Sequence, residues 1–411
     1  MRAIPADMNK LVRFALVGGV VVLLGCLSSS PTSATPDPTP STGNPTGGTP
    51  PTGNNPDPGN PSNPSNPSNP SNPSNPSNPS NPSNPSNPST PTTKPPTRPT
   101  GPIQVVYWGQ NGFGGANPGD PSKYEKDLAT VCTDNPNYDM VVLSFVTSFV
   151  HTRNQDGYPE MNFANHCETP WDTRNPFLLK CDAIATGIQT CHKNGQRVIL
   201  SLGGASGGYG FPTDADAKTF AKTVWDMFLN GGGAIRPLGA EPLDGIDLDI
   251  EGGSAAGYAT FVKTLRGYMN ADTSRPYYIG GAPQCPFPDA FLGPSMGSAL
   301  GDAASSFDYL FVQFYNNFCG YSAASPSSFA DSFSRWVGVH ANGGPKIIVG
   351  LPATTQAAAA ASYVPRTDLA GLLNSVKGNA AFGGMMLWDS SFDAQSVQSG
   401  KTYGAFARGL Y

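Results

Sequence analysis

Short apolar runs recur about eight times between Gly101 and Tyr411, and they constrain the fold more than any other feature of the chain. The runs are rich in β-branched and aromatic residues, which is typical of strands. They cover Gln104–Trp108, Met140–Phe145, Arg197–Ser201, Gly245–Ile250, Tyr277–Gly280, Tyr309–Phe314, Lys346–Val349 and Met385–Trp388. Between them, stretches such as Ala215–Leu229 and Tyr258–Met269 return apolar residues at intervals of three and four, as amphipathic helices do. Strands that alternate with helices predict a parallel α/β fold, and eight such units predict a single closed (β/α)8 TIM barrel over residues 101–411.

The segment before the barrel has a very different composition. Nearly every residue between about Pro31 and Pro102 is Pro, Ser, Thr, Asn or Gly, so there is too little apolar surface to offset the entropy of ordering the backbone. We therefore expect a disordered linker over residues 31–100. Within it the triplet Asn-Pro-Ser repeats about ten times from Asn60 to Ser89, which favours extended polyproline II geometry. We interpret the repeat as a spacer, with a binding role as the alternative.

Residues 1–30 resemble a targeting segment. Lys10 and Arg13 precede an apolar run from Phe14 to Leu24, which has the length of a signal h-region and is too short to span a bilayer comfortably. The run ends in L-L-G-C at Cys26, which resembles a bacterial lipobox with Cys26 as the lipidated residue. An ordinary signal peptide cleaved among the small residues 28–34, and a cytoplasmic protein with a buried apolar N-terminus, are the alternatives. The sequence predicts an extracellular protein, either released or held at the cell surface through Cys26.

The number and spacing of the cysteines are consistent with a protein that is exported from the cell. Of the seven, six lie in the expected barrel, namely Cys132, Cys167, Cys181, Cys191, Cys285 and Cys319. Six cysteines allow 15 pairings, and spacing does not choose among them. Because no C-x-x-C pair occurs and the four histidines have no metal-type spacing, we expect disulfide bonds in an oxidising compartment rather than a zinc site.

The charge of the chain restricts its partners. The formal net charge is −5, charged residues make up 13% of the sequence, and no block of Lys or Arg occurs. A polyanion such as nucleic acid is therefore not an expected partner. We expect a monomer that acts on a neutral polymer.

The segment Leu243–Glu251 (L-D-G-I-D-L-D-I-E) carries the strongest chemical signal. Because successive side chains of a strand point to opposite faces, Asp247, Asp249 and Glu251 share one face, which in a barrel is the interior. Three crowded carboxyl groups cannot all ionise cheaply, so at least one pKa should rise, as a general acid working near neutrality requires. The alternatives are solvated acids on an antiparallel strand and a divalent metal cluster, although the calcium pattern D-x-D-x-D-G is absent.

The segment D-G-I-D-L-D-I-E resembles the D-x-x-D-x-D-x-E signature of glycoside hydrolase family 18, and S-L-G-G at Ser201–Gly204 resembles that family's other motif. Five further segments narrow the resemblance to plant and fungal class III chitinases of the hevamine type. In order, they are Tyr107–Asn111 (Y-W-G-Q-N), Ala282–Asp289 (A-P-Q-C-P-F-P-D), Val312–Asn317 (V-Q-F-Y-N-N), Gly350–Ala353 (G-L-P-A) and Met386–Trp388 (M-L-W). The resemblance covers the whole barrel.

The resemblance implies cleavage of the β-1,4 linkages of chitin or chitooligosaccharides with retention of configuration, without a cofactor or metal. Glu251 would protonate the glycosidic oxygen as general acid, and the substrate's own 2-acetamido carbonyl would be the nucleophile that gives an oxazolinium intermediate. Asp249 would orient the acetamido N–H, and Asp247 would share a proton with it from beneath. Tyr315 would donate a hydrogen bond to the acetamido oxygen.

The same resemblance implies the rest of the site and the disulfides. Trp388 would form the apolar floor under the sugar at subsite −1. The other residues implied to line the cleft are Tyr107, Gln110, Phe145, Asn162, Gly204, Gln284, Gln313 and Asn316. The implied disulfide pairs are Cys132 with Cys191, Cys167 with Cys181, and Cys285 with Cys319.

Two alternatives to a chitinase remain open at this stage. One is a carbohydrate-binding protein of the same fold that has lost catalysis, although all four implied catalytic residues are present. The other is a related endo-N-acetylglucosaminidase or lysozyme-like enzyme, since any 2-acetamido sugar satisfies the mechanism.

The sequence also departs from the family pattern at two places. The segment Tyr138–Cys181 is longer than the family's short loops, and we expect it to reshape the non-reducing side of the cleft. Gly252 follows Glu251, where some relatives carry a bulkier residue.

Overall fold

The computed structural model describes residues 99–411. The predicted signal segment 1–30, Cys26 and the Asn-Pro-Ser repeat lie outside the described residues, as does the expected linker up to residue 98. Among the described residues, no helix is long and apolar enough to cross a membrane.

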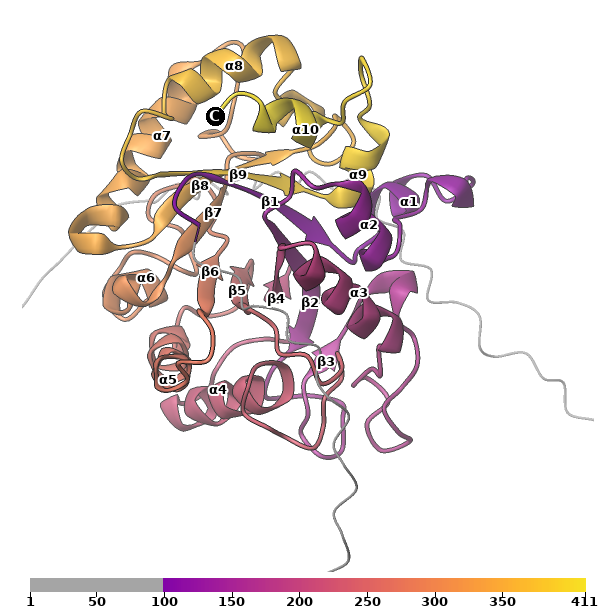
Figure 1. Cartoon of the computed structure of the whole chain (residues 1–411). Helices are drawn as coiled ribbons and strands as arrows, with labels where there is room; N and C mark the ends of the chain where they lie inside the picture. Colours follow the sequence, from indigo (N-terminus) through magenta and orange to yellow (C-terminus); the bar gives the residue numbers. More distant parts are fainter. Residues whose placement is uncertain (1–98) are drawn as a thin grey trace, which may run out of the picture. The chain divides into compact units, whose positions relative to one another are not determined.

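Eight parallel strands close into one barrel, so the predicted fold is confirmed (Figure 1). They are β1 (Ile103–Trp108), β2 (Met140–Ser148), β4 (Arg197–Gly204), β5 (Gly245–Ile250), β6 (Tyr278–Gly281), β7 (Tyr309–Gln313), β8 (Lys346–Pro352) and β9 (Phe382–Trp388). Neighbours along the sheet follow the order β1-β9-β8-β7-β6-β5-β4-β2, and the pairing of β1 with β2 closes the ring. A short strand, β3 (Glu160–Met161), pairs antiparallel with β2 beyond the barrel, and its two residues were too few to predict from the sequence.

Helices surround the barrel (Figure 1). The α-helices are α1 (Gly112–Ala116), α2 (Leu128–Asp134), α3 (Asp182–Lys193), α4 (Asp214–Phe228), α5 (Tyr258–Ala271), α6 (Ala299–Asp302), α7 (Ser327–Val337), α8 (Arg366–Asn374), α9 (Ser390–Gln395) and α10 (Tyr403–Arg408). The 3-10 helices are η1 (Pro121–Lys123), η2 (Ala164–His166), η3 (Ala304–Ser306), η4 (Gly338–Gly343) and η5 (Ala360–Ser362). Helix α4 begins at a reciprocal cap, in which the Thr213 side chain and the Asp216 side chain each accept a hydrogen bond from the other's backbone N–H.

Two apolar clusters lie on opposite sides of the sheet. The larger one fills the space between strands and helices, and it includes Ile246, Leu248 and Ile250 of β5. The smaller one fills the barrel interior. The carboxyl-bearing face of β5 therefore points inward, as its alternation predicts.

The predicted strands match the observed ones to within a few residues. The run predicted at Tyr309–Phe314 ends one residue early, because Phe314 packs into the outer cluster with its ring centroid 4.8 Å from that of Phe329.

Three disulfide bonds link the described segments, and they pair as the resemblance implies: Cys132–Cys191, Cys167–Cys181 and Cys285–Cys319. The first links α2 to α3, and the third links the segments that follow β6 and β7. The second closes the long segment between β3 and α3.

A charged histidine ties α3 to the amino-terminal end of β5. His192 is buried, and its two ring nitrogens lie 2.8 Å from Glu241 Oε1 and 2.9 Å from Asp244 Oδ2. Burial opposes protonation of the imidazole, but the hydrogen bonds to Asp244 and Glu241 outweigh it and raise the pKa of His192 to about 9.

This raised pKa predicts a loss of stability in alkali. The stabilisation is fully present below the unfolded-state pKa of about 6.5 and is lost as pH rises through the folded-state value. Urea unfolding should therefore show that His192→Gln lowers the free energy of unfolding by about 3 kcal/mol at pH 6 and by much less at pH 9.5. The exposed His151→Gln should change neither value. Equal losses for His192→Gln at both pH values would contradict a protonated His192.

Candidate active site

Asp247 lies at the centre of the barrel with no exposed surface. Its Oδ2 accepts hydrogen bonds from the Tyr107 hydroxyl at 2.6 Å and from Ser201 Oγ at 2.8 Å. Its Oδ1 is buried and has no hydrogen-bond partner among the described residues. Burial raises the pKa of Asp247 to about 6, although both hydrogen bonds oppose the rise.

Asp249 and Glu251 follow on the same face of β5. Asp249 Oδ1 accepts a hydrogen bond from Gln313 Nε2 at 3.0 Å, and the Asp249 carboxyl is also a hydrogen-bond partner of Glu251. Burial and then the charges of Glu251 and Asp247 raise the pKa of Asp249 well above its usual range. Burial and the Asp289 charge also raise the pKa of Glu251. The pKa values of Asp247, Asp249 and Glu251 are therefore all raised, as the sequence predicts for at least one of them, with burial as the largest cause and the neighbouring charges adding to it for Asp249 and Glu251.

Asp289 is a fourth buried acid that the sequence analysis did not single out. It accepts hydrogen bonds from the backbone N–H groups of Leu292 at 2.7 Å, Phe291 at 2.9 Å and Gln284 at 3.1 Å. Because it follows no predicted strand directly, only its place at the end of the segment A-P-Q-C-P-F-P-D could have drawn attention to it. Its charge reinforces the tendency of Glu251 to keep a proton.

Tyr315 offers a hydroxyl beside these acids. It is buried just beyond β7, and no hydrogen bond joins its hydroxyl to another described residue. Burial and then the charges of Asp249 and Glu251 raise the pKa of Tyr315 well above its ordinary value. Tyr315 is therefore a neutral donor whose hydrogen bond is not used within the described part of the chain.

Three aromatic rings form one wall of the site. The ring centroid of the half-buried Trp388 lies 5.6 Å from that of Tyr107 and 6.2 Å from that of Phe145, with the Phe145 ring nearly parallel to it at 22°. Gly204 makes room for this wall, since a Cβ there would lie 3.0 Å from the Phe145 ring and its φ is +91°. The structure thus brings Trp388, Tyr107, Phe145 and Gly204 together.

Two predicted cleft residues, Gln110 and Asn162, make hydrogen bonds with the backbone of the segment that carries Phe145. Gln110 Nε2 donates to the Ser144 carbonyl at 2.8 Å and to the Asn162 carbonyl at 3.0 Å. Asn162 exchanges two backbone hydrogen bonds with Phe145, at 2.8 and 3.0 Å. These contacts hold Phe145 in place, and direct binding of substrate by Gln110 or Asn162 stays a prediction.

Two other predicted residues are engaged in the loops at the rim. Gln284 Oε1 accepts a hydrogen bond from Asn317 Nδ2 at 3.1 Å. Asn316 Oδ1 accepts one from the Ala359 backbone N–H at 2.8 Å. Neither side chain hydrogen-bonds to Asp247, Asp249 or Glu251, so the role of Gln284 and Asn316 in binding also stays a prediction.

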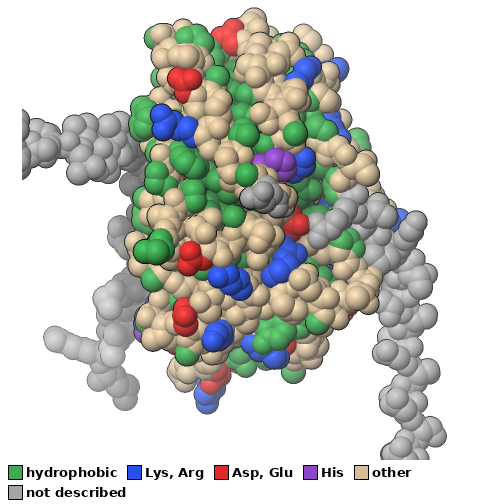
Figure 2. All heavy atoms as spheres, turned by 90° about the vertical axis from the view of Figure 1, so that its left-hand side faces the viewer, with side chains coloured by type: hydrophobic (Ala, Val, Ile, Leu, Met, Phe, Trp, Pro, Cys, Tyr) green, Lys and Arg blue, Asp and Glu red, His purple; other side chains and the backbone are tan. Residues whose placement is uncertain are grey.

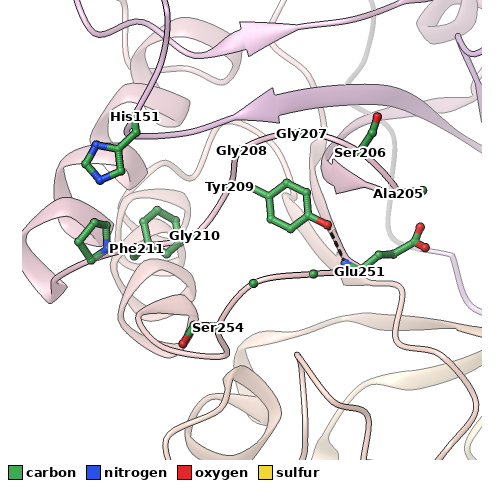
Figure 3. Close-up of a pocket in the computed structure, with 13 residues that line it drawn as sticks. His151, Ala205, Ser206, Gly207, Gly208, Tyr209, Gly210, Phe211, Glu251 and Ser254 are labelled. Atoms are coloured by element: carbon green, nitrogen blue, oxygen red, sulfur yellow. Dashed lines mark hydrogen bonds between the residues drawn. The ribbon is translucent and has the colours of Figure 1, made fainter. Parts of the chain in front are cut away.

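A cavity of about 580 Å³ adjoins Glu251 (Figure 3). It is lined by the β4–α4 loop from Ala205 to Pro212, by Glu251 to Ser254, and by His151. Tyr209, which no sequence motif indicated, lies between these loops, and its hydroxyl accepts a hydrogen bond from the Glu251 backbone N–H at 3.1 Å and donates one to the Gly204 carbonyl at 2.8 Å. Tyr209 therefore fixes the backbone of Glu251 against the end of β4.

Comparison with known proteins gives the family. A family model described as glycosyl hydrolases family 18 matches residues 104–374. The chain belongs to glycoside hydrolase family 18. It is similar to chitinase 2 of Rhizopus oligosporus (41% identity over 294 residues, 71% of this chain and 49% of that protein) and to acidic endochitinase SE2 of Beta vulgaris (37% identity over 292 residues, 71% and 87%).

A solved structure agrees with this assignment. The ICChI chitinase from Ipomoea carnea superimposes with a TM-score of 0.61 at 30% identity, over 75% of this chain and 100% of that one. The family 18 chain spans about half the length of the first curated relatives it matches.

Outside this group of acids, the buried carboxylate of Glu125 links the segments around this family 18 site. Glu125 Oε2 accepts hydrogen bonds from the backbone N–H groups of Asn111 at 2.8 Å and Gly109 at 3.0 Å, and lies 3.0 Å from His166 Nε2. Its Oε1 accepts a hydrogen bond from Ser390 Oγ. One carboxylate thus joins the loop after β1, helix η2 and the start of α9, directly after Trp388.

This arrangement predicts that Glu125→Gln loosens the aromatic wall. Gln keeps the shape but replaces one acceptor oxygen with a donor that faces other donors. Under the function proposed below, kcat/KM on N-acetylglucosamine hexamer should therefore fall on the order of tenfold. Glu241→Gln, which also loses a carboxylate–histidine pair but at the other end of the barrel, should lower stability without this loss. Equal kcat/KM values for both variants, measured where both are folded, would contradict a positioning role for Glu125.

Proposed function

We propose that this family 18 protein is a chitinase that hydrolyses β-1,4 linkages between N-acetylglucosamine residues with retention of configuration. The observation that carries the proposal is the placement of Asp249 and Glu251, whose pKa values are raised by burial, beside the Tyr315 hydroxyl, which makes no hydrogen bond to a described residue. The similarity to proteins named chitinases supports chitin as the substrate.

The chemistry follows from the protons and donors of the site. Glu251 gives its proton to the glycosidic oxygen as the bond to the anomeric carbon breaks. The carbonyl oxygen of the substrate's 2-acetamido group attacks that carbon and forms an oxazolinium ion, with Tyr315 donating to the same oxygen and Asp249 accepting from the acetamido N–H. Water then adds to the anomeric carbon and returns a proton to Glu251. Two displacements at one carbon give net retention.

The two remaining groups tune this step. Asp247 lies beneath Asp249, and its charge disfavours ionisation of Asp249, so a proton can be exchanged between them as positive charge develops on the sugar. Trp388, with Tyr107 and Phe145 around it, offers an apolar floor for the sugar at subsite −1.

The general-acid role of Glu251 predicts the effect of Glu251→Gln. The variant should fold and bind chitin while kcat falls by on the order of 10² to 10⁴ or more, since the proton donor is lost. Glu168→Gln, which changes an exposed carboxyl group, should leave kcat unchanged. Retention of most activity in Glu251→Gln would refute the assigned role.

A substrate panel distinguishes the chitinase proposal from its alternatives. The protein should release soluble oligosaccharides from colloidal chitin and not from peptidoglycan or N-glycosylated proteins, because the proteins it is similar to are named chitinases. The opposite pattern would contradict the chitin assignment. Binding to chitin with no cleavage would favour a carbohydrate-binding protein of the same fold.

We further propose that the protein acts outside the cell as a monomer, held at the surface through Cys26. The disulfide bonds support an oxidising compartment, where such bonds persist. The scattered surface charges do not suggest a polyanion as partner, and the face in Figure 2 shows Lys, Arg, Asp and Glu interspersed among polar and apolar side chains. Fractionation of cells that express Cys26→Ser should find the protein released from the membrane, and an unchanged distribution would exclude lipidation at Cys26.

A further inference from the structure

A second cavity adjoins the one beside Glu251. Its volume is about 340 Å³, and it is lined by Thr147, Ser148, His151, Arg153, Glu160, Gly207 and Gly208. Three of these residues, namely His151, Gly207 and Gly208, also line the first cavity. Figure 3 shows Glu251 and His151 at opposite ends of the β4–α4 loop, with Gly207 and Gly208 between them. The two cavities therefore form one path that leads away from Glu251.

The floor of this path is made of closely packed backbone. Ser148 Oγ donates to the Gly208 carbonyl at 2.7 Å, and the two residues pair as a parallel bridge. Gly207 has a φ of +131°, and a Cβ there would come within 2.2 Å of the Thr147 carbonyl oxygen. Only glycine fits where the β4–α4 loop lies against the end of β2. No side chain therefore projects from Gly207 into the path, and the hydrogen bond from Ser148 holds the loop in place.

Arg153 stands at the far end of the path in a fixed orientation. Its Nε donates to Glu160 Oε2 at 2.9 Å, its Nη2 donates to the same oxygen, and its guanidinium lies 3.5 Å from the centroid of the Phe177 ring. The side chain is nevertheless 66% exposed, and no hydrogen bond joins its Nη1 to a described residue. The exposed imidazole of His151 likewise has no hydrogen bond to a described residue. Both side chains offer polar groups to a ligand in the second cavity.

We propose that the two cavities hold the leaving-group half of the substrate chain, and that Arg153 and His151 bind a 2-acetamido sugar several units beyond the cleaved bond. This inference rests on the proposed chitinase function. Glu251 protonates the bond between the two halves of the substrate, and it lines the first cavity. Trp388, Tyr107 and Phe145, which underlie the other half, line neither cavity.

The chemistry of the second cavity suits a neutral sugar rather than an anion. The negative charge of Glu160 balances the positive charge of Arg153, so the pair adds no net charge to the cavity. Nη1 of Arg153 can still donate a hydrogen bond to an acetamido carbonyl or a hydroxyl group. Arg153 and His151 both belong to the long segment between Tyr138 and Cys181, whose length was expected to reshape the non-reducing side of the cleft. The proposal places part of that segment on the reducing side instead. An open path on that side favours cleavage at internal bonds of a chain.

The test compares where the full-length protein cleaves N-acetylglucosamine hexamer in water enriched in oxygen-18. The new reducing ends carry the label, so mass spectrometry of the early products gives the frequency of cleavage at each bond. In His151→Ala, and in the double variant Arg153→Gln with Glu160→Gln, cleavage that leaves the longer fragment on the reducing side should fall about fivefold relative to the other bonds. Cleavage of the trimer, which is too short to reach the second cavity, should stay within about twofold.

Arg174→Gln is the matched control. Arg174 lies in the same long segment, pairs with Asp156 through two hydrogen bonds and is 63% exposed, but lines neither cavity. Its cleavage pattern should equal that of the unaltered protein. Identical patterns in all variants would overturn the assignment of Arg153 and His151, whereas failure of the unaltered protein to cleave hexamer or trimer would overturn the proposed function itself.

Discussion

The structure of the site depends on the burial of Asp247 in the barrel interior. A carboxyl group removed from water needs hydrogen-bond donors, and two other strands of the barrel supply them through Tyr107 of β1 and Ser201 of β4. Ser201 pairs directly with Asp247 in the parallel register of β4 and β5, so the strand register and the chemistry are fixed together. Asp249 and Glu251 follow at intervals of two residues toward the open end, and exposure increases from Asp247 to Glu251. Glu251, the most exposed of the three, therefore lies beside the cavity.

The sequence was sufficient to predict the barrel and the centre of its site. Alternation along β5 placed three carboxyl groups inside, and apolar runs placed the strands, because both signals are local. The roles of Asp289, Tyr209 and Glu125 could not be predicted, since each acts through contacts between segments far apart in the chain. Counting cysteines left 15 pairings open, and the resemblance to class III chitinases was needed to choose the three that the structure contains. The roles of Cys26 and of the Asn-Pro-Ser repeat remain predictions, because both lie outside residues 99–411.

Buried carboxylate groups have different roles at the two ends of the barrel. At the amino-terminal end, His192 joins α3 to the residues before β5 and contributes to stability. At the carboxyl-terminal end, Glu125 contacts polar groups of the loop after β1, of helix η2 and of helix α9, and these contacts join the three segments. The Arg153–Glu160 pair is more peripheral and fixes a polar group beside the cleft. This division follows the general rule that the carboxyl-terminal face of such a barrel carries the function.

The central claim is that the substrate's acetamido group acts as the nucleophile while Glu251 supplies and recovers the proton. Proton NMR of the first products formed from N-acetylglucosamine hexamer tests it most directly, because the configuration of the new reducing end records the number of displacements. The account predicts that the β-anomer appears first and then equilibrates to the α-anomer. Initial formation of the α-anomer would contradict it, since a single displacement by water needs neither Tyr315 nor an oxazolinium ion.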